Sequence, residues 1–134
     1  MTAGTPSAIA RSMVSGKSET LGVVFQHADF FANRADFNLA VMEGITEGAV
    51  SLGYDLMLHT KPVADAAADA AALTDGRVDG VLILRDSNDQ ATGMLIKKQF
   101  PCVMFFTRSD REEVPFADAD NTLGARLATE HLVG

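Results

Sequence analysis

The stretch "YDLMLHTKPVADAAADAAALTDGRVDGVLIL" (residues 54–84) decides the fold. Its two ends, residues 54–59 and 78–84, are short and mostly apolar, which is typical of strands covered by helices on both faces. The segment 63–76 between them is rich in alanine, the residue most favourable to a helix, and it ends at a glycine. The stretch therefore predicts a strand, a crossover helix and a second strand parallel to the first.

The same alternation continues on both sides of this unit. Further strands are expected at residues 21–26 and 102–106, with a weaker one at 115–120. The other expected helices cover residues 37–50, 88–100 and 120–134. The sequence therefore predicts an α/β fold, a three-layer open parallel sheet in the order 2-1-3-4-5 with right-handed crossovers and helices on both faces.

Composition limits the classes of partner. The 134 residues are 47% hydrophobic, as expected for one globular domain, and the net charge is −7. Nonspecific binding to nucleic acid depends on clustered lysine and arginine, so the negative net charge argues against an extended surface that binds the phosphate backbone. Any contact with DNA is therefore expected to be local.

Cysteine content and hydropathy indicate the compartment. The single cysteine, Cys102, lies in the apolar run "PCVMFF", where a packed thiol is expected rather than a nucleophile. The N-terminal residues contain no apolar stretch of signal-peptide length, and no window approaches the ~18 apolar residues of a membrane span. We therefore expect a cytoplasmic protein with no membrane partner.

Motifs of catalysis and cofactor binding are missing. No G-x-G-x-x-G follows the first apolar run, and the sequence contains neither a P-loop nor a G-x-S-x-G elbow. His27, His59 and His131 are far apart and lack metal-ligand spacing. The sequence thus predicts a protein that is not an enzyme, with no cofactor, no metal site and no catalytic residues.

The loops that follow the strands offer the best candidate binding site. In open parallel sheets, ligands bind outside the carboxyl ends of the strands. The loops there carry aromatic rings together with the charged residues Arg85, Asp86, Arg108 and Asp120. Carboxylates and guanidinium groups suit vicinal hydroxyls and rings suit the apolar face of a sugar, although loops are generally polar, and both interpretations stay open.

Four segments carry a resemblance to a known family. They are "PSAIARSMVSGKSETLGVV" (6–24), "GYDLMLH" (53–59), "RVDGVLIL" (77–84) and "DNTLGARLATEHLVG" (120–134). In this order and spacing they resemble the lactose-repressor (LacI/GalR) family of bacterial transcriptional regulators. The resemblance implies a periplasmic-binding-protein-like type I fold, an effector pocket between two subdomains, a homodimer, and operator binding through a helix-turn-helix headpiece.

The resemblance also divides the chain. Residues 1–19 would be the hinge segment following an absent headpiece, and residues 20–134 the N-terminal subdomain of the effector-binding domain, with the C-terminal subdomain absent. Within a hinge helix at 7–16, Ala10, Arg11 and Met13 would contact DNA, with Met13 at the position of the leucine that wedges into the minor groove. The alternative that "ARSM" is a frayed leader stays open.

The resemblance further implies which residues bind the effector. The first loop offers two aromatic candidates, Phe30-Phe31 and Asp36-Phe37, and the interval to Gly53 favours the second. Where many relatives end the fourth strand in Asp-Arg, this chain has Thr107-Arg108, as in members that sense glucosides. The expected effector site therefore comprises Asp36, Phe37, Arg85, Asp86, Thr107, Arg108 and Asp120.

The function expected from these residues is regulatory. The chain would be the effector-sensing part of a LacI-type repressor that binds a small molecule, a sugar by the argument above, and controls operator DNA binding. A sugar-binding protein of a transport system shares the fold and remains the alternative. An enzyme such as a sugar-phosphate isomerase would need a convergent acid and base, and the sequence does not supply such a pair.

Overall fold

The computed structural model describes residues 7–25, 35–60, 63–85, 88–106 and 114–134. Strands and helices alternate from the first strand to the fourth, as the apolar pattern predicts. The elements are α1 (Ala8–Ser15), β1 (Thr20–Phe25), α2 (Ala35–Leu52), β2 (Asp55–His59), α3 (Ala66–Leu73), β3 (Gly80–Leu84), α4 (Gln90–Lys97), β4 (Cys102–Phe105), β5 (Phe116–Ala117) and α5 (Asn121–Val133).

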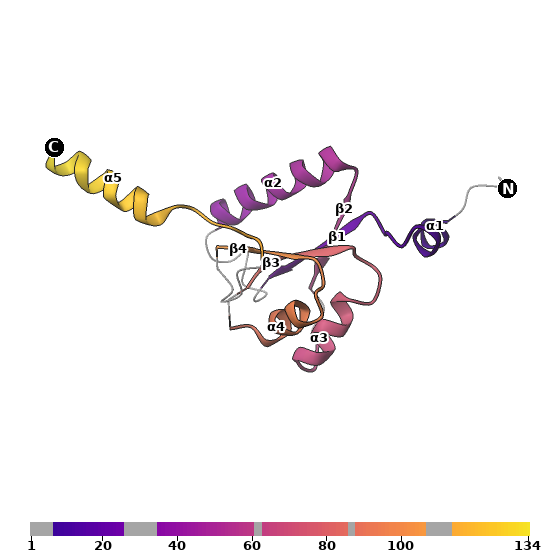
Figure 1. The fold of residues 1–134 in the computed structure, drawn as a ribbon. Helices are drawn as coiled ribbons and strands as arrows, with labels where there is room; N and C mark the ends of the chain where they lie inside the picture. Colours follow the sequence, from indigo (N-terminus) through magenta and orange to yellow (C-terminus); the bar gives the residue numbers. More distant parts are fainter. Residues whose placement is uncertain (1–6, 26–34, 61–62, 86–87, 107–113) are drawn as a thin grey trace.

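The strands form one parallel sheet in the order β2-β1-β3-β4-β5, which confirms the predicted order (Figure 1). In the register of the sheet, Val24 lies opposite His59 of β2 and Ile83 of β3. Because every strand runs the same way, the carboxyl ends of all strands meet at one edge of the sheet. We call this the carboxyl edge and the opposite one the amino edge.

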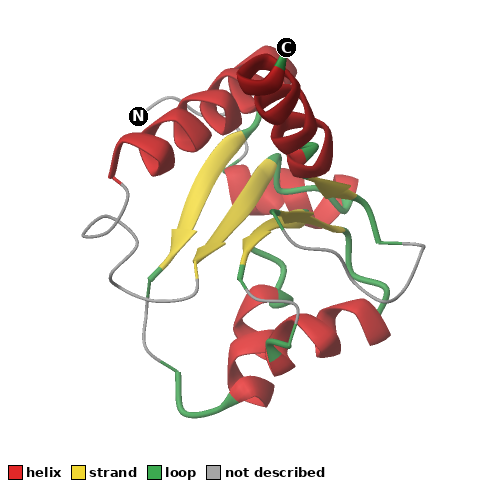
Figure 2. Cartoon of the chain, turned by 90° about the vertical axis from the view of Figure 1, so that its left-hand side faces the viewer, coloured by secondary structure: helices red, strands yellow, loops and turns green. Residues whose placement is uncertain are grey.

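Helices cover both faces of the sheet, as predicted. Helix α2 lies over one face, and α3 and α4 lie side by side over the other (Figure 2). Asp65 caps the start of α3 and Asp89 caps the start of α4, each accepting a hydrogen bond from a backbone amide three residues later. The crossover helices therefore begin at the carboxyl edge and return the chain to the amino edge.

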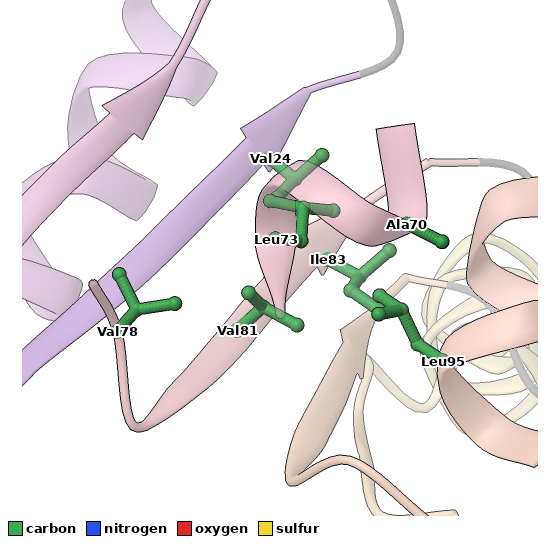
Figure 3. Packing of buried hydrophobic residues seen from close by; sticks show 7 residues of the cluster. All are labelled: Val24, Ala70, Leu73, Val78, Val81, Ile83 and Leu95. Carbon is green, nitrogen blue, oxygen red and sulfur yellow. The ribbon is translucent and has the colours of Figure 1, made fainter. Parts of the chain in front are cut away.

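A cluster of buried hydrophobic residues lies between the sheet and the α3/α4 layer (Figure 3). Successive side chains of a strand point to opposite faces, so alternate residues such as Val81 and Ile83 reach the same layer. There they pack with Leu73 of α3 and Leu95 of α4, which are 1% exposed. Ala70 of α3 belongs to the same cluster.

The two terminal helices differ from the rest. Helix α1 is capped by Ser7 and by Gly16 at φ +72°, it contains no buried residue, and it occupies the predicted 7–16 range. Helix α5 contains no buried residue either, and Figure 1 shows it extending from the sheet and the other helices. Within the described residues, no helix combines the length and hydropathy needed to cross a bilayer.

Candidate functional site

A buried ion-pair network occupies the carboxyl edge of the sheet. The Nε2 atom of His59 lies 2.9 Å from Oδ1 of Asp69, and Nη1 of Arg85 lies 2.5 Å from Oδ2 of the same carboxylate. The side chains are 6%, 9% and 11% exposed for His59, Asp69 and Arg85. One carboxylate thus faces two basic side chains in a region of low solvent access.

The strand–helix–strand unit assembles this network. His59 is the last residue of β2, Asp69 lies in the first turn of α3, and Arg85 directly follows β3. Parallel pairing brings both strand ends to the carboxyl edge, and the crossover helix begins there. The positive end of the helix dipole also favours the Asp69 carboxylate at this position.

Arg85 links further elements to the network. Its Nε donates a hydrogen bond to the carbonyl oxygen of Phe25 at 3.0 Å, and its Nη1 lies 3.4 Å from Oδ2 of Asp89. The same Asp89 oxygen accepts hydrogen bonds from the amide and hydroxyl of Thr92 at 2.8 and 2.7 Å. A single guanidinium therefore ties the end of β1 to α3 and to the start of α4.

The pKa of Asp89 reflects these contacts. Partial burial acts to raise the pKa of this carboxyl group, but the hydrogen bonds from Thr92 and the positive charge of Arg85 outweigh it. The pKa of Asp89 is therefore below its usual value of 3.8, and the group is ionised at neutral pH. Its negative charge is available to pair with Arg85.

Two aromatic rings meet at the carboxyl edge of the sheet. Phe37 near the start of α2 packs on Phe106, which directly follows β4, with ring centroids 4.9 Å apart and planes inclined by 54°. Phe106 in turn contacts Phe105 at 5.9 Å. Phe37 and Phe106 are 40% and 42% exposed, so part of each ring faces solvent. The carboxyl edge thus combines an ion-pair network with accessible ring surface, a set of groups suited to a polar ligand with an apolar face.

No protein-family model and no curated protein matches this chain. Solved structures match it over most of its length. A transcriptional regulator LacI from Bacillus cereus subsp. cytotoxis aligns with 85% of this chain at 25% identity and a TM-score of 0.70. The chain shares its fold with LacI-family transcriptional regulators.

Two more structures extend the likeness. A transcription regulator like protein from Staphylococcus haemolyticus aligns with 87% of the chain at 20% identity and a TM-score of 0.71. The complex of the transcriptional regulator CelR with cellobiose aligns with 98% at 22% identity and a TM-score of 0.66. The chain spans 42% of the Bacillus structure and 45% of each of the other two. These neighbours are described as transcription regulators, not as enzymes.

Several predicted effector residues can be located on this LacI-type fold. Asp36 and Phe37 lie at the start of α2, and Phe37 packs on Phe106. Arg85 is engaged in the ion-pair network, and Asp120 caps α5 by accepting a hydrogen bond from the Leu123 amide at 2.9 Å. The remaining three, Asp86, Thr107 and Arg108, lie outside the described residues. Contact of these residues with an effector stays a prediction.

Sequence reasoning missed four residues of this edge: His59, Asp69, Asp89 and Phe106. No pattern in the sequence pairs Asp69 with an arginine 16 residues away. Phe106 had a signal, since it ends the apolar run "CVMFF" and therefore falls at the carboxyl edge. Within the described part of the chain, no three histidine, cysteine or acidic side chains gather as metal ligands would.

The predicted hinge residues lie in α1. Ala10 and Arg11 are exposed, and the side chain of Met13 is 80% exposed. Their contact with DNA stays a prediction. Ser7 and Gly16 supply the hydrogen bonds that end the helix on each side, so this short segment has its own start and stop signals.

A separate hollow of about 690 Å³ lies at the amino edge of the sheet. Its walls come from the starts of β1, β3 and β4, the end of α4 and residues 114–115. Cys102 lines it, and burial raises the pKa of that thiol. A raised pKa keeps the thiol protonated at neutral pH, which agrees with the expected packed cysteine rather than a nucleophile.

Proposed function

We propose that this chain forms the hinge and the N-terminal effector subdomain of a LacI-type transcriptional regulator that responds to a sugar. The observation that carries the proposal is the alignment with the CelR–cellobiose complex over 98% of the chain, which takes in α1 as well as the sheet. Residues 1–19 are the hinge segment in this proposal, and residues 20–134 are the subdomain. The boundary falls where β1 begins at Thr20.

The proposed effector site is the carboxyl edge. The exposed ring surface of Phe37 and Phe106 suits stacking against the apolar face of a sugar. Asp36, which precedes Phe37 in the chain, is also exposed. Asp86, Thr107, Arg108 and Asp120 complete the proposed set of hydroxyl partners. Arg85 belongs to this edge because its ion pairs with Asp69 and Asp89 and its hydrogen bond to the Phe25 carbonyl hold the ends of β1 and β3 and the starts of α3 and α4 together.

The proposed operator contact is α1. Met13 is 80% exposed, so its side chain is accessible to the minor groove of DNA. In the complete regulator, which acts as a homodimer in this proposal, Met13→Gly should lower operator affinity and leave sugar affinity nearly unchanged. Glycine removes the apolar wedge and also disfavours the helix.

Two measurements on the complete regulator test the proposal. Operator sequences are first selected from random duplex DNA, and their affinity is measured by fluorescence anisotropy with and without sugar. Calorimetry with a sugar panel that includes cellobiose then identifies the effector. We expect sequence-selective DNA binding that one sugar alters. Sugar binding without any selected DNA sequence would instead favour the transport-protein alternative.

A further inference from the structure

One carboxylate holds the segment that joins α1 to β1. Oδ1 of Asp79 accepts hydrogen bonds from the amide and hydroxyl of Ser18 at 2.6 and 3.0 Å, and Oδ2 accepts one from the Glu19 amide at 2.9 Å. The Asp79 amide also donates to the carbonyl oxygen of Thr20 at 2.8 Å. Asp79 immediately precedes β3, so this clamp ties the end of the linker to the amino edge of the central strand.

The clamp holds the linker in an unusual conformation. Glu19 has φ +53°, in the left-handed region that residues other than glycine rarely adopt. Both carboxylate oxygens of Asp79 accept hydrogen bonds from successive amides, Oδ1 from Ser18 and Oδ2 from Glu19. A turn of this kind persists where surrounding contacts over-determine it, and the Asp79 carboxylate supplies three such contacts.

Asp79 is charged when it makes these contacts. Burial acts to raise its pKa, but hydrogen bonds from Ser18 and Glu19 and the nearby charge of Lys17 lower the pKa below its ordinary value. Hydrogen bonds to an ionised carboxylate are stronger than those to a neutral acceptor. The α1 helix itself has no buried residue, so packing of its side chains does little to set its direction.

We propose that Asp79 is a positioning residue for operator binding, because its carboxylate sets the direction in which α1 leaves the sheet. This inference rests on the proposed function, in which α1 is the hinge helix. Asp79 lies at the amino edge, whereas the proposed effector site lies at the carboxyl edge. The clamp therefore acts on the DNA-binding side of the domain, at the opposite end of β3 from the Arg85 network.

The charge of Asp79 allows two explanations of a change in DNA affinity to be distinguished. Replacing Asp79 by asparagine removes a negative charge near α1, which favours attraction to DNA phosphates. It also leaves only one acceptor oxygen and turns an NH₂ group toward one of the amides that the carboxylate now accepts. If Asp79 positions α1, the substitution should weaken operator binding, because the hydrogen bonds that hold the linker are lost. If only the removed negative charge mattered, operator binding should become stronger.

The experiment compares Asp79→Asn with Asp75→Asn in the complete regulator. Asp75 is a matched control, because it lies four positions earlier, its substitution changes the charge equally, and its carboxylate pairs with the exposed Arg77 at 2.8 Å. Affinity is measured for the operator that the wild type selects and for random duplex DNA of equal length. We expect Asp79→Asn to lose about tenfold in operator affinity, the effect of one charge-assisted hydrogen bond, and to keep its affinity for random DNA.

A second variant with a smaller structural change tests the same hydrogen bonds with less risk of a folding defect. Ser18→Ala removes only the hydroxyl hydrogen bond and keeps the backbone donor, so operator affinity should fall by a smaller factor. The double variant Ser18→Ala/Asp79→Asn should bind operator no more weakly than Asp79→Asn alone, because both changes act on one clamp. Amide hydrogen exchange at residues 18 and 19 should speed up in Asp79→Asn and not in Asp75→Asn.

The outcomes separate the two proposals. A wild-type regulator that selects no operator overturns the proposed function, and the role of Asp79 with it. A wild type that discriminates operator from random DNA, with Asp79→Asn discriminating equally well, overturns only the positioning role. Equal loss of affinity for both kinds of DNA shows a general structural defect and also overturns it.

Discussion

Arg85 shows how a residue's surroundings constrain its role. Its position directly after β3 made it a candidate effector ligand, and the structure surrounds it with Asp69, Asp89 and the Phe25 carbonyl. Its side chain is 11% exposed, so the ion pair with Asp69 is shielded from water. Removing one member of a buried pair is costly, because the other charge is left without compensation.

Stability should therefore depend strongly on Asp69. Asp69→Ala leaves both Arg85 and His59 without their shared carboxylate, and we expect the free energy of unfolding to fall by about 3–5 kcal/mol. Urea denaturation measures this loss. The control is Asp75→Ala, which breaks the exposed pair with Arg77 and should cost about 0–1 kcal/mol. Equal losses in the two variants would contradict a buried network.

The depressed pKa of Asp89 predicts a pH dependence of stability. A carboxyl group whose pKa is lower in the folded state contributes its full stabilisation above the unfolded value, near 3.8, and loses it as pH falls through the folded value. Unfolding free energy should therefore drop in this acidic range, and Asp89→Asn should make the drop smaller. Urea titrations at a series of acidic pH values compare the two proteins. If the free energy of unfolding of Asp89→Asn fell as steeply at acidic pH as that of the wild type, the stabilising role of the ionised Asp89 carboxylate would be contradicted.

At the scale of elements, close contacts between strands leave no room for side chains at certain glycines. A Cβ added at Gly80 would lie 3.0 Å from the Pro101 carbonyl oxygen, which is backbone and cannot rotate away. A Cβ added at Gly44 of α2 would meet nothing within 4 Å. The same substitution should therefore have opposite effects at these two positions.

We expect Gly80→Ala to lower the free energy of unfolding by about 1–3 kcal/mol, because β3 and β4 must separate slightly. Gly44→Ala should raise it by about 0.4–1 kcal/mol, because alanine restricts the unfolded chain and favours the helix. Chemical denaturation of the two variants checks both signs. A neutral Gly80→Ala would show that the strand spacing is more adaptable than the structure indicates.

The order of the strands and helices was predictable from the sequence, whereas the ion-pair network at the carboxyl edge was not. Asp65 and Asp89 are helix caps whose signals are local, so the starts of α3 and α4 follow from the sequence. The pairing of Asp69 with His59 and Arg85 depends on strand register and on how far α3 is rotated about its axis. Strand register and helix rotation are set by tertiary packing, so they cannot be predicted from a local sequence pattern.

At the scale of the whole molecule, the chain spans 45% of the CelR structure, and in the proposed function the effector pocket has walls from two subdomains. The isolated 134 residues should therefore bind sugar only in the millimolar range or more weakly. Exposed leucines of α5, with Leu127 53% and Leu132 85% exposed, should make this chain self-associate. Calorimetry with cellobiose and sedimentation measure both properties. Micromolar binding by a monodisperse monomer would contradict the two-walled pocket.

The short central strand β3 has a consequence for tolerated changes of length. Asp79 directly precedes its five residues and Arg85 directly follows them, so the strand spans the interval between the linker clamp and the ion-pair network. One inserted residue would lengthen that interval by about 3.3 Å and turn every later side chain to the opposite face. No single insertion or deletion between residues 79 and 85 can keep both contacts. Changes of chain length in this protein are therefore expected to be tolerated in the loops rather than in β3.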